Sequence, residues 1–125
     1  MNMVTIDLDT MLTWVQDAIN DGVNINKIEL GSEINHDNEY KILKYPTAGD
    51  YARDCQRYID SLNIIVPNAN FTLVGGNRGD TERAAHWNDS LYTFVDSESF
   101  NGLAWHVYLY MKDEHAGFSN RKFLC

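Results

Sequence analysis

The apolar residues of the chain fall into stretches with the helical period and, between them, short runs typical of buried strands. The first helical stretch begins near residue 8, with Asp7 or Asp9 placed to cap its start and Gly22 to end it. Thr47, with Asp50 three residues later, resembles a capping box and predicts the start of a second helix. The residues expected on the inner faces of these two helices are Leu8, Met11, Leu12, Val15, Ile19, Tyr51, Cys55, Tyr58, Ile59 and Leu62.

The rest of the pattern predicts strands and one further helix. Short β-rich runs at residues 25–31, 71–74 and 103–110 predict three strands, and residues 3–6 are expected to be the tail of an earlier one. Residues 35–45 form a polar stretch that predicts a loop. A third helix is predicted to open at Asp80 or Thr81. The residues expected on or near its inner face are Ala84, Ala85, Trp87, Leu91 and Phe94.

Strands that alternate with helices predict an α/β fold with a parallel sheet of about three to four strands. No linker, repeat or low-complexity run interrupts the sequence. Residues 1–125 are therefore interpreted as one domain, with residues 115–125 as an irregular tail.

The charge balance of the chain limits the classes of partner that it is expected to bind. Ten basic residues against eighteen acidic ones give a formal net charge of −8, which argues against binding to nucleic acid or to an anionic membrane surface. Neutral ligands such as sugars do not require a basic surface, so they remain compatible with this charge. Residues 1–20 lack the basic start and apolar run of a signal peptide, and no stretch approaches the roughly 20 apolar residues of a membrane span.

The cysteine and histidine positions do not predict a metal site or a cofactor, because none stands at metal-ligand spacing. Cys55 and Cys125 lie far apart in the sequence, and a disulfide between them is one interpretation. The other is that Cys55 packs as a small apolar residue in the second helix, which its position in the helical pattern favours.

Polar residues follow each predicted strand, where the loops of a parallel sheet form its ligand site. These three strand ends are residues 31–35, 75–78 and 106–108. Glu33 is the sharpest candidate, because a carboxylate just past a buried strand has a raised pKa and can donate a proton near neutral pH. The alternative for Glu33 is a solvated loop carboxylate.

Other residues near these strand ends have two interpretations each. Arg78 is either a donor to a substrate or a surface ion-pair partner, and the glycines around it lack the spacing of a phosphate-binding loop. Trp87 and Trp105 could stack on sugar rings, although tryptophans on a helix or strand are more often core. His106 is either a site residue or a satisfied core histidine.

These residues resemble a known family. The run LDTMLTWVQDAINDGVNINKIELGSEIN is similar to the part of retaining (β/α)8-barrel glycoside hydrolases that leads into their acid/base strand. The later pieces YPT, GDYA and VGGN resemble the segment after that strand, and LAWHVYLY is similar to the sixth barrel strand. The resemblance covers roughly residues 3–112 and implies a half (β/α)8 barrel.

The resemblance implies a role for each matching residue. Glu33 matches the proton-donating glutamate, and four residues match positions that line the substrate cleft: Asn77, Arg78, His106 and Tyr108. Ser32 and Asn35 flank Glu33 and are further candidate substrate-binding residues. Ser32 departs from the family, where an asparagine at this position bonds the sugar 2-hydroxyl.

Retaining hydrolysis also needs a second carboxylate about 5–5.5 Å from the first, and none stands at a matching position. The chain is therefore expected to be part of a larger enzyme, to self-associate or join a larger assembly, or to be a reduced binding domain. Two further hypotheses stand beside the hydrolase: a carbohydrate-binding or assembly module without hydrolysis, and an unrelated α/β protein that acts through protein contacts.

Overall fold

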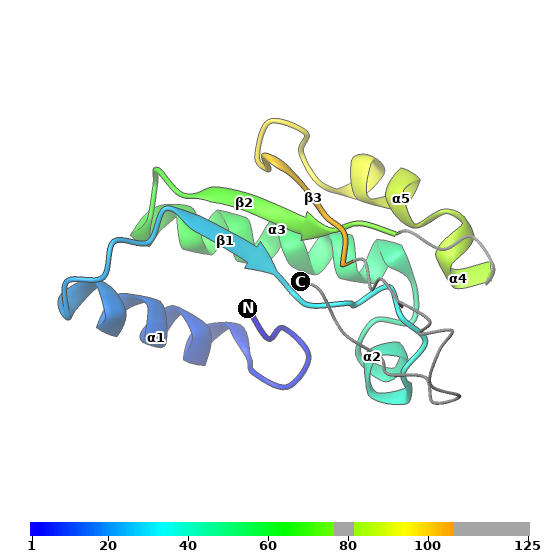
Figure 1. Ribbon diagram of the computed structural model, residues 1–125, viewed down its shortest axis with the longest axis horizontal. Coiled ribbons are helices and arrows are strands. Elements are labelled where there is room, and N and C mark those ends of the chain that lie inside the picture. Colours follow the sequence, from blue (N-terminus) through cyan, green and yellow to red (C-terminus); the bar gives the residue numbers. More distant parts are fainter. Residues whose placement is uncertain (77–81, 107–125) are drawn as a thin grey trace, which may run out of the picture.

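The computed structural model describes residues 1–76 and 82–106. These residues form helices and a parallel sheet in one layer each, so the predicted α/β class is confirmed (Figure 1). In chain order the elements are α1 (Leu8–Asn20), β1 (Lys27–Leu30), α2 (Glu39–Lys44), α3 (Ala48–Ile65), β2 (Asn70–Val74), α4 (Glu82–Ala85), α5 (Trp87–Phe94) and β3 (Gly102–Ala104).

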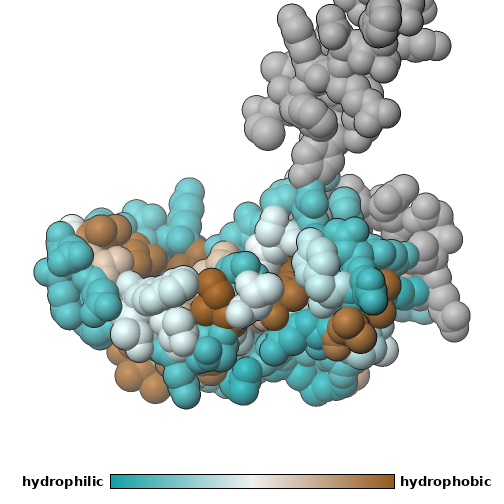
Figure 2. All heavy atoms as spheres, turned by 90° about the horizontal axis from the view of Figure 1, so that it is seen from below, coloured by the Kyte–Doolittle hydropathy of each residue, from teal (hydrophilic) through white to brown (hydrophobic). Residues whose placement is uncertain are grey.

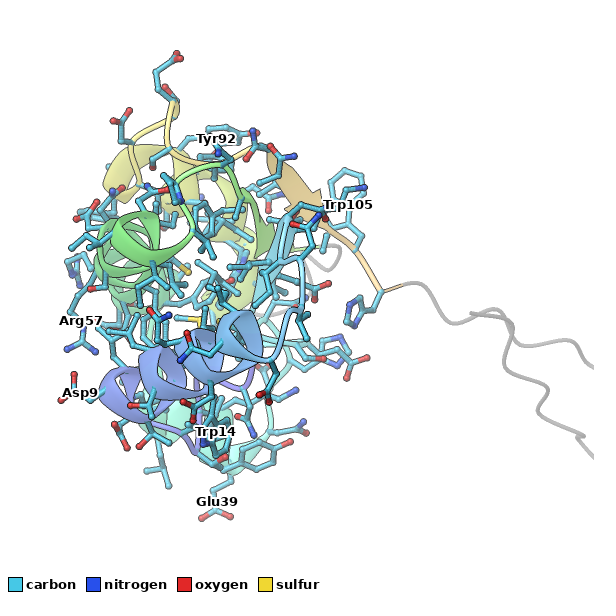
Figure 3. All side chains as sticks on the ribbon, turned by 90° about the vertical axis from the view of Figure 1, so that its left-hand side faces the viewer. Asp9, Trp14, Glu39, Arg57, Tyr92 and Trp105 are labelled. Atoms are coloured by element: carbon cyan, nitrogen blue, oxygen red, sulfur yellow. The ribbon has the colours of Figure 1, made fainter. Side chains whose placement is uncertain are left out.

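The three strands lie in the order of the sequence, β1-β2-β3, and both pairs are parallel. Leu30, Leu73 and Leu103 stand side by side in register and face the core, whereas the neighbouring row of Glu29, Thr72 and Gly102 is only half-buried. Figure 3 shows why: α1, α3 and α5 all lie on one side of the sheet, and Trp105 lies on the other side. The described helices therefore cover one face of the sheet and leave its second face open.

The core forms between this covered face and the helices. The apolar positions predicted for α1 and α3 lie in it: Met11, Val15 and all five predicted residues of α3 are buried. Cys55 is buried and free, which confirms its interpretation as a core residue. The largest fully buried side chains are Met3, Leu30, Ile34, Tyr45, Tyr51, Tyr58, Ile59, Leu62, Phe71, Leu73, Trp87 and Leu91.

The predicted helix caps are present. The Asp7 side chain accepts from the Thr10 N–H at 2.9 Å and so begins α1. At α3 the hydroxyl of Thr47 accepts from the Asp50 N–H at 3.1 Å, and the Asp50 carboxylate accepts from the Thr47 N–H at 3.0 Å. Both halves of the capping box are made, so the sequence pattern here determined the helix start.

The structure differs from the prediction in two segments near β1. Residues 3–6 form a turn instead of a strand tail. Met1 pairs with the edge of β1, since its N–H donates to the Glu29 carbonyl and its own carbonyl accepts from the Gly31 N–H. The predicted loop at residues 35–45 contains helix α2, whose apolar side chains at positions 40, 42 and 43 are exposed and so gave no amphipathic signal.

The third predicted helix is interrupted, because α4 ends at Ala85 and α5 begins at Trp87. Ala84, Trp87 and Leu91 are buried as predicted, whereas Ala85 and Phe94 are exposed. The predicted caps Asp80 and Thr81 lie outside the described residues. The strand predicted at residues 103–110 is confirmed only at its start, because β3 ends at Ala104 and residues 105–106 are not in a strand; residues 107–110 lie outside the described residues.

The exposed large apolar side chains lie on several elements. They include Trp14 on α1, Leu43 on α2, Ile64 on α3 and Tyr92 on α5. The face seen in Figure 2 accordingly shows separate hydrophobic patches among hydrophilic residues. Within residues 1–76 and 82–106, no helix is long and apolar enough to cross a membrane.

The hydroxyl of Tyr51 is inserted into the sheet where β1 and β2 end. The Asn70 N–H donates to the Asn26 carbonyl at 2.9 Å, and the same register would place the Val74 N–H on the Leu30 carbonyl. Instead, the Tyr51 hydroxyl donates to the Leu30 carbonyl at 2.5 Å and accepts from the Val74 N–H at 2.8 Å. The two strands therefore separate at this point, and the phenol satisfies both backbone groups.

We expect Tyr51→Phe to lower the free energy of unfolding by about 1–3 kcal/mol, because it leaves a buried N–H and a buried carbonyl without their partner. Urea unfolding of the wild type and the variant measures this difference. Tyr92→Phe is the matched control, since Tyr92 is 60% exposed, and should change stability by less than about 0.5 kcal/mol. Equal stability of Tyr51→Phe and wild type would contradict the inserted phenol.

A second prediction concerns alkaline pH. Burial raises the pKa of the Tyr51 phenol well above its ordinary value of 10.0, and burial with a hydrogen bond to Asp54 raises that of Tyr45. The folded protein keeps both protons where the unfolded chain loses them, so stability is complete below about pH 10 and falls as the pH rises further. Urea unfolding across this range measures the fall, which should be shallower in Tyr51→Phe. Stability that is constant or increases above pH 10 would exclude this linkage.

Candidate functional site

A tight turn follows β1 and positions Glu33 at the carboxyl edge of the sheet. Gly31 has a φ of +90°, and a Cβ at this position would lie 2.5 Å from Cγ1 of Ile34, so the turn requires glycine. Glu33 itself has a φ of +49° and is the only non-glycine residue with positive φ in the described part of the chain. Such a conformation costs about 1–3 kcal/mol and is commoner at functional sites. Its predicted position past the strand end is confirmed.

Four ionisable side chains meet at this edge of the sheet. Nε2 of His106 lies 3.1 Å from Oε1 of Glu29, and its Nδ1 lies 3.7 Å from Oε1 of Glu33. The other oxygen of Glu33 lies 3.9 Å from Nδ1 of His36. The side chain of Glu33 is 22% exposed, so solvent and a small ligand can reach a carboxylate that is flanked by two imidazoles.

The side chains of this cluster are of types that can hold and exchange protons. A histidine nitrogen donates or accepts according to its tautomer, and a carboxylate accepts until it is protonated. The His106 ring contacts a carboxylate at each nitrogen, so a proton can be held on either side of it. Glu33 stands in the middle of the cluster, between His106 and His36. The arrangement therefore suits Glu33 to give or take a proton with the imidazoles as neighbouring carriers.

Arg83 holds the loop that carries Glu33 and His36. Its guanidinium donates to the carbonyls of Ile34 at 2.8 Å, Tyr45 at 3.1 Å and His36 at 3.3 Å. The side chain is only 9% exposed, and burial lowers the pKa of Arg83 from its ordinary value. The carbonyls of Ile34 and His36 are thus joined to that of Tyr45 by one largely buried cation, which fixes the path of the chain through the site.

An aromatic cluster packs against the guanidinium of Arg83. The guanidinium carbon lies 4.8 Å from the ring centroid of Trp87, and Trp87 stacks on Tyr51 at 5.5 Å. The Trp87 indole N–H donates to the Val74 carbonyl at 2.9 Å, so this cluster holds the end of β2 as well. The Gly76 N–H donates to the side chain of Asn88 at 2.8 Å. The backbone on both sides of the site therefore bonds to α3, α4 and α5.

A cavity of about 450 Å³ lies next to Glu33 and opens to solvent. Its size is within the range of small-molecule sites. The lining residues are Met1, Asn2, Met3, Val4, Thr5, Ser32, Glu33, Ile34, Tyr40 and Lys41.

Four of the seven sequence-predicted site residues lie in the described part of the chain. Glu33 and His106 are in contact, and Ser32 lines the cavity beside Glu33. Asn35 is buried and lies with Glu33, His36 and His106 around one small space, so the structure brings the ends of β1 and β3 together as predicted. The remaining candidates, Asn77, Arg78 and Tyr108, lie outside the described residues.

The two tryptophans that were candidates for sugar stacking differ in how far they are exposed. Trp87 is a core residue, as its position in the helical pattern favoured, with 1% of its surface exposed. Trp105 is 59% exposed, so a core role for it is wrong. Its indole lies on Gly75, which follows β2, since a Cβ at this position would lie 2.1 Å from the indole nitrogen. The indole therefore lies against backbone at the carboxyl edge of the sheet, beside the site.

Sequence reasoning did not identify Glu29, His36 and Arg83 as parts of the site. Glu29 stands between two buried residues of a strand, and that alternation marks it as facing the open side of the sheet. Arg83 stands four residues before Trp87, a spacing that places a cation beside an aromatic ring on a helix. His36 gave no signal, because its contact with Glu33 depends on the turn.

Comparisons with known proteins leave the class of the chain open. No protein-family model, no curated protein and no solved structure matched it. The resemblance to retaining glycoside hydrolases therefore stays a prediction. Within residues 1–76 and 82–106, no group of three His, Cys, Asp or Glu side chains is arranged to hold a metal ion.

We expect Arg83→Lys to lower the free energy of unfolding by about 1.5–3 kcal/mol, since one ammonium cannot replace the planar donors that reach three carbonyls. Thermal or urea unfolding measures the loss. Arg57→Lys is the control, because Arg57 is 60% exposed and its described partners are the Asp54 carboxylate and the Tyr58 ring; its effect should be below about 0.5 kcal/mol. Similar effects of the two variants would show that Arg83 does not anchor the loop.

Proposed function

We propose that this chain is a glycoside-hydrolase-like α/β domain in which Glu33 is the general acid/base for a carbohydrate ligand. The observation that carries the proposal is the environment of Glu33. Its carboxylate lies at the carboxyl edge of a parallel sheet, on a residue with positive φ, between the imidazoles of His36 and His106. General acid/base catalysis needs a positioned group with neighbours that can exchange protons, and the cluster supplies both.

The arrangement of the sheet supports a half-barrel interpretation. In a (β/α)8 barrel, parallel strands follow one another in sequence order and every helix lies outside the barrel. Here the strand order is sequential, and α1, α3 and α5 lie on the same face of the sheet. In this proposal the open face, with Glu29 and Thr72, corresponds to the inside of the barrel.

A retaining mechanism also needs a nucleophile. Glu29 is the other carboxylate of the cluster, but the imidazole of His106 lies between it and Glu33. A sugar carbon cannot occupy the same space, so Glu29 is better suited to orient His106 than to attack a sugar. We therefore infer that the nucleophilic carboxylate comes from outside the described residues or from a second copy of the chain.

The second candidate function is carbohydrate binding without hydrolysis. The exposed indole of Trp105, at the same edge of the sheet, favours it. Aromatic faces stack on the apolar faces of sugar rings, and binding of this kind needs no second carboxylate. In this alternative Glu33 and its neighbours would bond sugar hydroxyls and would not transfer a proton.

The hydrolase proposal predicts that the protein cleaves an aryl glycoside and that Glu33→Gln lowers kcat by about 10²–10⁴-fold, because glutamine cannot transfer the proton. A panel of nitrophenyl glycosides measures this. If a second copy supplies the nucleophile, activity per molecule should also rise with protein concentration. Glu98→Gln is the control, since Glu98 is exposed on the loop before β3, and it should retain wild-type activity.

Two results would count against this proposal. Equal activity of wild type and Glu33→Gln would remove Glu33 from the mechanism. Binding of sugars without turnover, unchanged in Glu33→Gln, would instead favour the binding module.

A further inference from the structure

The lysine on α2 is buried, although its neighbours on this helix are exposed. Lys41 is 6% exposed, whereas Tyr40 is 55% and Leu43 is 75% exposed. Lysine side chains are almost never fully buried unless they are paired. The Lys41 Nζ donates to the carbonyl of Glu33 at 2.8 Å and lies 5.8 Å from the ring centroid of Tyr40. Its ammonium is thus directed toward the turn that carries Glu33.

The described hydrogen-bond partner of the Lys41 ammonium is a neutral carbonyl and not a carboxylate. Among residues 1–76 and 82–106, no carboxylate oxygen forms an ion pair with its Nζ within 4.0 Å. An ammonium has three donors, and one neutral carbonyl satisfies one of them. A buried charge without a counter-ion is costly, so an anion that reached Lys41 would be held strongly.

The side chain of Lys41 lines the cavity of about 450 Å³ described above. The rest of the lining is neutral apart from Glu33 and the amino group of Met1, with polar side chains of Asn2, Thr5 and Ser32. The cavity therefore combines the buried ammonium of Lys41 with the amino group of Met1, the carboxylate of Glu33, and hydroxyl and amide groups. A compact organic anion that also carries hydroxyl groups is complementary to the ammonium and to the hydroxyl and amide groups.

We propose that this cavity binds a small organic acid whose carboxylate pairs with Lys41. The identity of this acid rests on the proposed function: it is an acidic sugar, with its carboxylate at Lys41 and its ring beside Glu33. The net charge of −8 repels anions from the surface as a whole, so binding depends on the cations that line the cavity. Of these, Lys41 is the more buried, and selectivity for an acidic over a neutral sugar is expected to come mainly from it.

The test is calorimetric titration of the full chain with D-glucuronate and, as the matched neutral sugar, D-glucose. Lys41→Met keeps the length of the side chain and removes its charge. Lys44→Met is the control, because Lys44 is exposed on the same helix. We expect glucuronate to bind wild type and Lys44→Met alike, at least tenfold more tightly than glucose, and to lose at least tenfold in affinity in Lys41→Met.

Folding of Lys41→Met is checked by its unfolding curve, and the variant should be as stable as wild type or more stable, because a buried charge is removed. A Lys41→Arg variant, which keeps the charge, should retain binding and covers the case in which Lys41→Met does not fold. Equal affinity for glucuronate and glucose, or no binding of glucuronate, would overturn the proposal. So would unchanged binding in Lys41→Met.

These outcomes are separate from those of the hydrolase proposal, since binding is measured without turnover. Glucuronate binding that depends on Lys41, in a protein that cleaves no glycoside, would support the anion site and contradict the hydrolase proposal. Cleavage of neutral glycosides with no binding of glucuronate would support the hydrolase proposal and contradict the anion site.

Discussion

The hydroxyl of Tyr51 is the interaction on which the carboxyl edge of the sheet depends. It replaces the direct hydrogen bond that the register would form between the Val74 N–H and the Leu30 carbonyl. Because a phenol oxygen takes up space that the direct bond would close, β1 and β2 separate at this point. The chain after Leu30 then turns through Gly31, and Glu33 reaches the edge of the sheet.

The same interaction connects the site to the hydrophobic core. Tyr51 is fully buried, and it stacks on Trp87, which holds the Val74 carbonyl and lies under the guanidinium of Arg83. Arg83 in turn holds the carbonyl of Ile34 in the loop that carries the site. A strained carboxylate residue is therefore kept in place by core residues, as is expected where a fold stabilises an unfavourable backbone conformation.

Much of the fold could be predicted from the sequence because its signals are local. The capping box at Thr47 and the helical spacing of residues 51–62 depend only on nearby residues, and both were right. Helix α2 was not predicted, because its exposed apolar residues form no inner face. The strand tail at residues 3–6 was wrong, since the pairing with β1 involves Met1 alone.

The site was predictable only in part. Glu33 and His106 could be placed near one edge, because both belong to recognisable strand regions and parallel strands end at the same edge. His106 was predicted inside a strand, whereas β3 ends at Ala104, two residues before it. The role of Arg83 could not be predicted, since its partners are backbone carbonyls far from it in the sequence. Every residue has a carbonyl, so the sequence does not indicate which ones bind a side chain. The contact between Glu29 and His106 depends on the strand register, and the position of the Trp105 indole on Gly75 depends on the contact between β2 and β3.

A phenol hydroxyl stands between the ends of β1 and β2 and so shapes the site. NMR can observe this in the native protein. We expect a slowly exchanging Tyr51 hydroxyl proton with a nuclear Overhauser effect to the Val74 amide proton, and no scalar coupling across a bond from the Val74 nitrogen to the Leu30 carbonyl carbon. A direct coupling between these two backbone groups, with no hydroxyl proton near Val74, would show that the phenol is not inserted between the strands.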